Sequence, residues 1–311
     1  MNAAAPVKAV PVALDSHSTL DEALQQLVRA CLEQFNANAP DAATSRNTEF
    51  LHQARIALRR MRSALRLAGP ADAAACFLRT ELKWLSGTLG AARDWDVLLA
   101  VTLPPAGRAY AASGTDDAEA AREMARLLGA ARRQRTKARQ RVREALGSAR
   151  HAALVAAIEH WIAKGPTAPN VALALPDYAA GQVRKLHKRL LRQAAALGGS
   201  GTPAERHRTR ICAKRLRYAV EFFGSLYAAR SVRRYRRELV ALQDSLGALN
   251  DAATASRLLA ALPAAGESAP FIRGWLAARE EDSVSAARLA LRRLNRLPRF
   301  WKSSPRTGKQ S

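Results

Sequence analysis

The residues best suited to bind a charged ligand lie between His52 and Arg66, in the segment HQARIALRRMRSALR. The segment lacks proline and glycine and is rich in helix-forming residues, so it predicts a helix. On that helix one arc of about 80° is entirely basic, with His52, Arg55, Arg59, Arg62 and Arg66 in it. No acidic residue occurs between Glu49 and Asp72. Because like charges at these spacings repel, this basic stripe predicts an anionic partner.

A second segment, HRTRICAKRLRYAV, repeats the pattern. Its residues His207, Arg210, Lys214 and Arg217 take the positions of His52, Arg55, Arg59 and Arg62, while Arg215 matches Arg60. Each copy is followed by a second segment, and these two segments also match: LKWLSGTLGAARD from Leu82 and LVALQDSLGALND from Leu239. Because order and spacing are kept, the sequence predicts an internal duplication of about half the chain.

The doubled pattern, H-x-x-R-I-x-x-[RK]-R-x-R followed about 40 residues later by L-G-x-x-[RN]-D, resembles the CHAD family, the conserved histidine α-helical domain. The resemblance covers roughly residues 18–300. It implies an all-α protein of two similar helical bundles that face each other across a basic cavity. It also implies a stand-alone member that binds inorganic polyphosphate, often at polyphosphate granules. Many members carry a triphosphate-tunnel domain before this region; here the region starts by about residue 18, so we carry over no catalysis.

Composition supports a helical, anion-binding protein. The 311 residues are 48% hydrophobic but only 5% aromatic, and the net charge is +24. This charge favours a polyanionic partner without identifying it. Three widely separated cysteines, Cys31, Cys76 and Cys212, fit a reducing compartment. No run of about 18 apolar residues occurs, so we expect no membrane span and a cytoplasmic location.

The expected organisation follows from caps and prolines. Capping boxes at Thr19–Glu22 and Thr202–Glu205 start two helices, and no segment alternates like a strand. We expect a loop at about 36–46 and a helix end at Pro104–Pro105. The domains would be a flexible N-terminal tail (1–17), a first bundle (18–165), a linker (166–176), a second bundle (177–298) and a C-terminal tail (299–311).

The predicted polyphosphate-binding residues come from both basic stripes. The first choices are His52, Arg55, Arg59, Arg62, His207, Arg210, Lys214 and Arg217. The second choices are Arg60, Arg66, Arg215, Lys83 and Arg93. The two histidines would either contact the ligand or fix helix packing. Asp94 and Asp251 are expected to orient arginines of the stripes.

We expect no catalytic residue, metal or cofactor, but two other classes stay open. A nucleic-acid-binding or granule-associated scaffold protein would use the same charge. Only 17 of the 311 residues are aromatic, and none lies in the basic arcs, which disfavours base stacking. A metal-dependent phosphoanhydride hydrolase would use Asp94 and Asp251, although the sequence shows no paired His/Cys spacing typical of a metal site.

Overall fold

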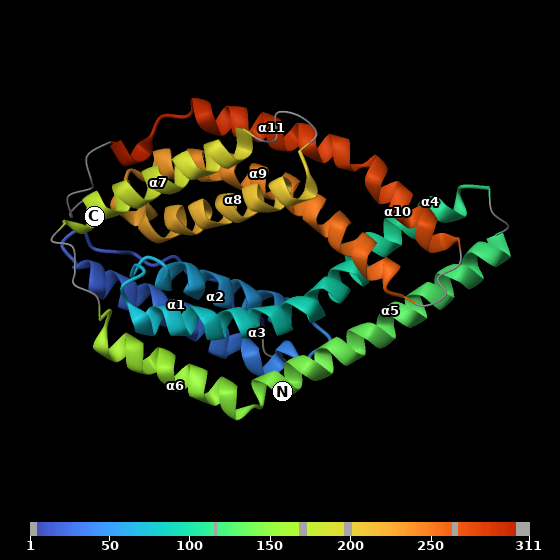
Figure 1. Ribbon diagram of the computed structural model, residues 1–311, viewed down its shortest axis with the longest axis horizontal. Helices are drawn as coiled ribbons and strands as arrows, with labels where there is room; N and C mark the ends of the chain where they lie inside the picture. The colour runs from blue at the N-terminus through green and yellow to red at the C-terminus, as the bar shows by residue number, and fades with distance from the viewer. Residues whose placement is uncertain (1–4, 115–116, 168–172, 196–200, 263–266, 303–311) are drawn as a thin grey trace.

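The computed structural model describes residues 5–114, 117–167, 173–195, 201–262 and 267–302. Within these residues every regular element is a helix (Figure 1), which confirms the predicted all-α class. None of the described helices combines the length and hydrophobicity needed to cross a lipid bilayer. The helices form two groups that lie one above the other in Figure 1.

The first group packs around α2. Its helices are α1 (Leu20–Ala42), α2 (Glu49–Leu65), α3 (Ala73–Val97) and α6 (Ala149–Lys164). The predicted capping box at Thr19 starts α1. The apolar side of α2, including the buried Leu51, Leu58 and Met61, packs between α1 and α3. Because that side is buried against α1 and α3, the basic stripe of α2 faces away from the core of its own group.

The second group packs in the same order. Its helices are α7 (Leu175–Ala195), α8 (Pro203–Phe223), α9 (Ala229–Ala260) and α11 (Glu280–Arg296). A capping box at Thr202 starts α8, as predicted. Helix α8 contacts α7 and α9 in the way that α2 contacts α1 and α3. The duplication itself stays a prediction from the sequence.

The two groups are joined at one end of the molecule. There α3 continues through a π-helical turn into α4, and the long α5 turns back beside it (Figure 1). Helix α10, which follows α9 in the chain, packs on both α4 and α5. The elements are the π turn (Leu98–Thr102), α4 (Leu103–Ala111), α5 (Asp117–Leu146) and α10 (Ser268–Ala278). The Glu123 carboxylate joins them, since it accepts hydrogen bonds from the Tyr110 hydroxyl at 2.6 Å and the Ser268 amide at 3.0 Å.

Three prolines lie within helices where the sequence predicted a loop or a helix end. Pro104 and Pro105 lie in the first turn of α4, where a missing N–H costs little. Pro40 lies inside the last turn of α1, so the helix reaches Ala42 instead of ending near residue 36. Buried Asn38 anchors this turn, because its side chain exchanges hydrogen bonds of 3.0 and 2.9 Å with the backbone of Val7.

The described parts of both expected tails, residues 5–17 and 299–302, contact the helices. The backbone N–H of buried Leu14 donates to the Ser225 hydroxyl at 3.0 Å, so the N-terminal segment reaches the second group. Phe300 and Trp301 are buried beside Tyr235. Large aromatic side chains gain too much by burial to stay in solvent. Residues 1–4, 303–311 and the linker residues 168–172 lie outside the described part of the chain.

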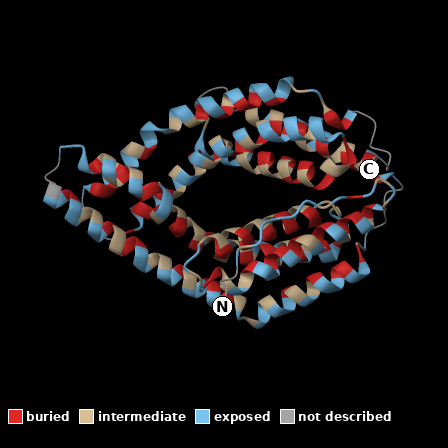
Figure 2. Cartoon of the chain, turned by 180° about the vertical axis from the view of Figure 1, so that it is seen from behind, coloured by how far each residue is buried: buried red, intermediate tan, exposed pale blue. Residues whose placement is uncertain are grey.

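Buried positions follow the same division into groups. In Figure 2 they lie mainly where the helices of each group pack together, whereas outer helices such as α5 and α11 carry many exposed positions. The basic residues of α2 and α8 are mostly of intermediate exposure, in contrast to the exposed basic residues on α5. The two predicted stripes therefore lie in a distinct, partly desolvated environment.

Candidate anion-binding site

A cavity of about 510 Å³ lies between α2 and α8 and is bordered by α3 and α9. We call it the central cavity. Four helices supply its charged and titratable lining: His52, Arg55 and Arg59 from α2, Arg93 and Asp94 from α3, Arg210 and Lys214 from α8, and Asp251 from α9. Residues 155 positions apart in the chain, such as Arg55 and Arg210, thus share one cavity.

The cations in the central cavity are crowded and partly desolvated. Burial, followed by the charges of Arg59, Arg210 and Arg55, lowers the pKa of Lys214 to about 6. Burial and Arg93 lower the pKa of His52 to about 4, and burial and Arg59 lower that of Arg55 to about 10. Each of these shifts disfavours the charged form, so an anion that entered the cavity would relieve the repulsion.

The acidic side chains of the cavity neutralise little of this charge. Asp94 lies 3.6 Å from the Arg55 guanidinium and 3.9 Å from that of Arg257. Burial raises the pKa of Asp94, an effect that Arg55 and Arg257 only partly offset. These long ion pairs fit a carboxylate that orients Arg55. Among the described residues, no group of three or more His, Cys, Asp or Glu side chains could hold a metal ion.

The two histidines have different surroundings. His52 lines the central cavity itself. His207 is exposed and lines an adjoining pocket of about 340 Å³ with Arg206, Arg210 and Arg257. Arg206 forms an ion pair with Glu280 there. Arg210 borders both spaces, so the His207 pocket opens beside the central cavity and extends its basic lining.

Other cations cluster farther along α2 and α8. Burial, Arg79 and Arg215 lower the pKa of Arg62, and burial, Arg215 and Arg79 lower that of Arg66 to about 10. Arg189 of α7 is the neighbouring charge that most lowers the pKa of Arg215. Arg62, Arg66 and Arg215 are therefore brought together, but with two arginines that the sequence analysis did not select. The spacing of Lys185, Arg189 and Arg192 at i, i+4 and i+7 was a usable signal for α7.

Three other predicted residues lie outside the central cavity, the His207 pocket and the cluster of Arg62, Arg66 and Arg215. Arg60 is buried, donates to the Gln34 side-chain oxygen at 3.2 Å and lies over the Phe222 ring. Arg217 donates to Glu221 at 2.7 Å and to Gln243 at 3.1 Å. Burial lowers the pKa of Arg217, but the hydrogen bond to Glu221 and the charges of Glu221 and Asp244 together outweigh it, so the pKa is raised. Lys83 is exposed and lines neither the central cavity nor the His207 pocket.

Comparison with known proteins gives a consistent picture. The model of the CHAD domain family matches residues 26–260. A crystal structure of the CHAD domain from the plant Ricinus communis is similar with a TM-score of 0.78 and 36% sequence identity, covering 93% of this chain and 96% of that one. PptA from Streptomyces chartreusis has the same fold, with a TM-score of 0.64 and 22% identity over 89% of this chain and 99% of that one. No curated protein matches the chain.

Proposed function

The chain belongs to the CHAD family, and from this premise we propose that it binds inorganic polyphosphate in the central cavity without cleaving it. One observation carries the proposal: the guanidinium and ammonium groups of α2, α3 and α8 converge on one partly desolvated space. Guanidinium groups can bind two phosphate oxygens at once. Low water content strengthens each such contact. The protein would act as a binding module at polyphosphate granules in the cytoplasm.

The residues that line the central cavity favour binding of a phosphate chain over nucleic-acid binding and over phosphoanhydride hydrolysis. Among the described residues, no Phe, Tyr or Trp side chain lines the central cavity, so nucleobases would find only the His52 imidazole to stack on. A hydrolase would need carboxylates free to hold a metal or activate water. Asp94 instead interacts with Arg55 and Arg257. The cavity is thus suited to hold a uniformly charged linear anion and offers little for chemistry on it.

Competition at fixed salt tests this function. Labelled long-chain polyphosphate is bound to the purified protein and displaced by unlabelled polyphosphate, RNA, DNA or short phosphates. We expect polyphosphate to compete at least about a hundredfold better than nucleic acid at equal phosphate concentration, and to be recovered uncleaved. Equal competition by RNA or DNA would mean that the net charge acts only as a general attractor. Release of orthophosphate would support the hydrolase instead.

The pKa of Lys214 predicts that binding is coupled to proton uptake. In the unliganded protein this pKa is about 6, against an ordinary value of 10.5. A bound polyanion favours the charged amine. We therefore expect affinity to fall by up to about tenfold per pH unit above pH 7. Calorimetry in buffers of different ionisation enthalpy should show the uptake of up to about one proton by Lys214.

The control for this coupling is Lys214→Arg, because an arginine stays charged across pH 7–9. Proton uptake should decrease in this variant while binding remains. Equal uptake by the variant and the natural protein would contradict the assignment. Since the folded pKa of Lys214 is below its unfolded value, the unliganded protein should also become less stable as pH falls from about 10.5 to 6.

A further inference from the structure

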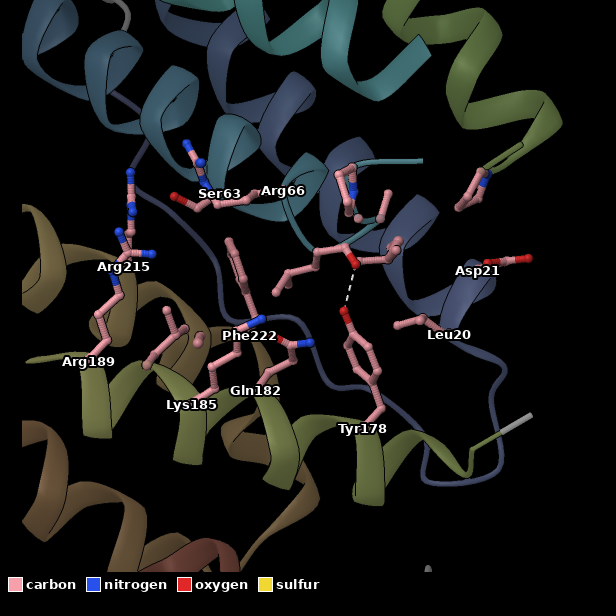
Figure 3. A pocket seen from close by; sticks show the side chains of 18 residues that line it. Leu20, Asp21, Ser63, Arg66, Tyr178, Gln182, Lys185, Arg189, Arg215 and Phe222 are labelled. Atoms are coloured by element: carbon pink, nitrogen blue, oxygen red, sulfur yellow. Dashed lines mark hydrogen bonds between the residues drawn. The ribbon is translucent and has the colours of Figure 1, made fainter. Parts of the chain in front are cut away.

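A second cavity, of about 330 Å³, lies at the other end of α2 and α8. We call it the end pocket. Helices α1, α2, α7 and α8 contribute to it, together with the segment that follows α2 (Figure 3). Its residues on α2 and α8 follow those of the central cavity along both helices, since Ser63 comes after Arg59 and Arg215 after Lys214. The two cavities therefore have no residue in common.

One side of the end pocket is cationic. Its four basic residues are Arg66, Lys185, Arg189 and Arg215. In the described part of the chain none of the four forms an ion pair with a carboxylate. Burial and Arg215 lower the pKa of Arg66 to about 10, and burial and Arg189 lower that of Arg215. Four positive charges are more than one phosphate group can pair with. Their number suits a ligand that carries two or three phosphate groups.

Most of the other side chains that line the end pocket are apolar. Leu24, Leu67, Leu186, Ala219 and Phe222 line it. In Figure 3 the Phe222 ring lies between Arg189 and Arg215 on one side and Leu20 and Asp21 on the other. Leu24, Ala219 and Phe222 are almost fully buried, so the accessible apolar wall consists mainly of the partly exposed Leu67 and Leu186. A bare phosphate chain would leave these two side chains in contact with water. A ligand with a flat apolar body joined to its phosphates would bury the wall.

Polar side chains beside the apolar wall favour a ligand with a heterocyclic ring over one with an acyl chain. Gln182 and Asp21 line the pocket and offer amide and carboxylate groups. The Tyr178 hydroxyl donates to the Leu67 carbonyl at 2.6 Å and so fixes the wall after α2 (Figure 3). A heterocyclic ring has polar edges that can pair with such groups, whereas an acyl chain does not. A volume of about 330 Å³ is at the small end of the range for small-molecule sites.

We propose that the end pocket binds a nucleoside di- or triphosphate, with its phosphates on Arg66, Arg189 and Arg215 and its base against Leu67 and Leu186. Lys185 adds a fourth positive charge to the phosphate side. The occupant and the place both differ from those of the proposed polyphosphate site. The protein thus has two anion sites, one for a uniform phosphate chain and one for a phosphorylated ring compound.

Calorimetric titration with ATP and with tripolyphosphate, at equal ionic strength, tests this inference. The two probes carry similar phosphate charge, but only ATP has a base. We expect ATP to bind at least about tenfold more tightly, because the base buries apolar surface. The double variant Lys185→Ala/Arg189→Ala should weaken ATP binding by at least about tenfold, since it removes two of the four phosphate contacts.

Helix α7 offers a matched control. Arg184 and Lys188 are exposed on the same helix and do not line the end pocket, so Arg184→Ala/Lys188→Ala removes the same charge and should change ATP affinity by less than about twofold. Equal losses in the two double variants, or equal binding of ATP and tripolyphosphate, would overturn the proposal.

A third variant separates the two sites. ATP binding should persist when Arg55, Arg59, Arg210 and Lys214 of the central cavity are all alanine. Loss of ATP binding in that variant would place the nucleotide in the central cavity and overturn the assignment. If ATP binds as expected but polyphosphate does not bind the natural protein, only the proposed polyphosphate function fails.

Discussion

Replacing Arg55, Arg59, Arg210 and Lys214 together by alanine should abolish polyphosphate binding. These residues supply four of the cations of the central cavity, two from each helix group. Hydrogen bonds to charged groups contribute about 1.5–3 kcal/mol each, so the combined loss should exceed about a thousandfold in affinity. Equilibrium binding of labelled polyphosphate measures the loss, and circular dichroism shows whether the helices remain folded.

The control removes the same number of charges from the outside of α5. Arg132, Arg133, Lys137 and Arg141 are exposed and lie outside the central cavity. Changing these four to alanine leaves the shaped site intact and lowers only the long-range attraction, which salt screens. We expect a loss of no more than about threefold in affinity at physiological salt. Similar losses from both quadruple variants would show that the protein attracts polyanions without a defined site.

Replacing Asp96 by alanine should destabilise the fold by about 3–5 kcal/mol. Asp96 is buried and holds α5 against α3, accepting from Arg135 Nε at 2.6 Å and lying 3.4 Å from Arg139. The Arg139 side chain is only 12% exposed, so the variant would leave a nearly buried guanidinium without its carboxylate. Urea denaturation followed by circular dichroism measures the change in the free energy of unfolding.

An exposed acid provides the reference for Asp96. Asp244 lies on the surface of α9, and Asp244→Ala should change the free energy of unfolding by no more than about 0.5 kcal/mol. Asp96→Asn keeps the shape of the side chain but removes its charge. Its loss in free energy of unfolding should therefore lie between those of Asp96→Ala and Asp244→Ala. If Asp96→Ala were as stable as Asp244→Ala, the buried ion pairs would contribute nothing to holding α5 in place.

The helices and the basic stripes were predictable because they depend on local patterns. Capping boxes at Thr19 and Thr202 and the period of apolar residues along α2 are properties of neighbouring residues. The repeat of the basic stripe 155 residues later needed only the sequence as well. Helix ends at prolines were less predictable, because Pro40 and Pro104 are tolerated in terminal turns.

The basic stripes alone could not show which of their residues line the central cavity. Arg59 and Arg60 are neighbours in the chain, yet a helix turns by about 100° per residue. Arg59 therefore reaches the central cavity, while Arg60 points between α1 and α8, where Gln34 and Phe222 surround it. Cavity-lining arginines can be distinguished from packed ones only when the neighbour of each helix face is known.

By itself the sequence determined the helical class and the two basic stripes, since each follows from residue type and spacing along one helix. From the stripes it predicted an anionic partner. Only the tertiary structure decided which cations share a space. It brought His52 into the central cavity and left His207 beside it, and it added Arg189 of α7 to Arg66 and Arg215. The physical reason is that charge repulsion and desolvation act between side chains through space, across helices that the chain brings together only when it folds.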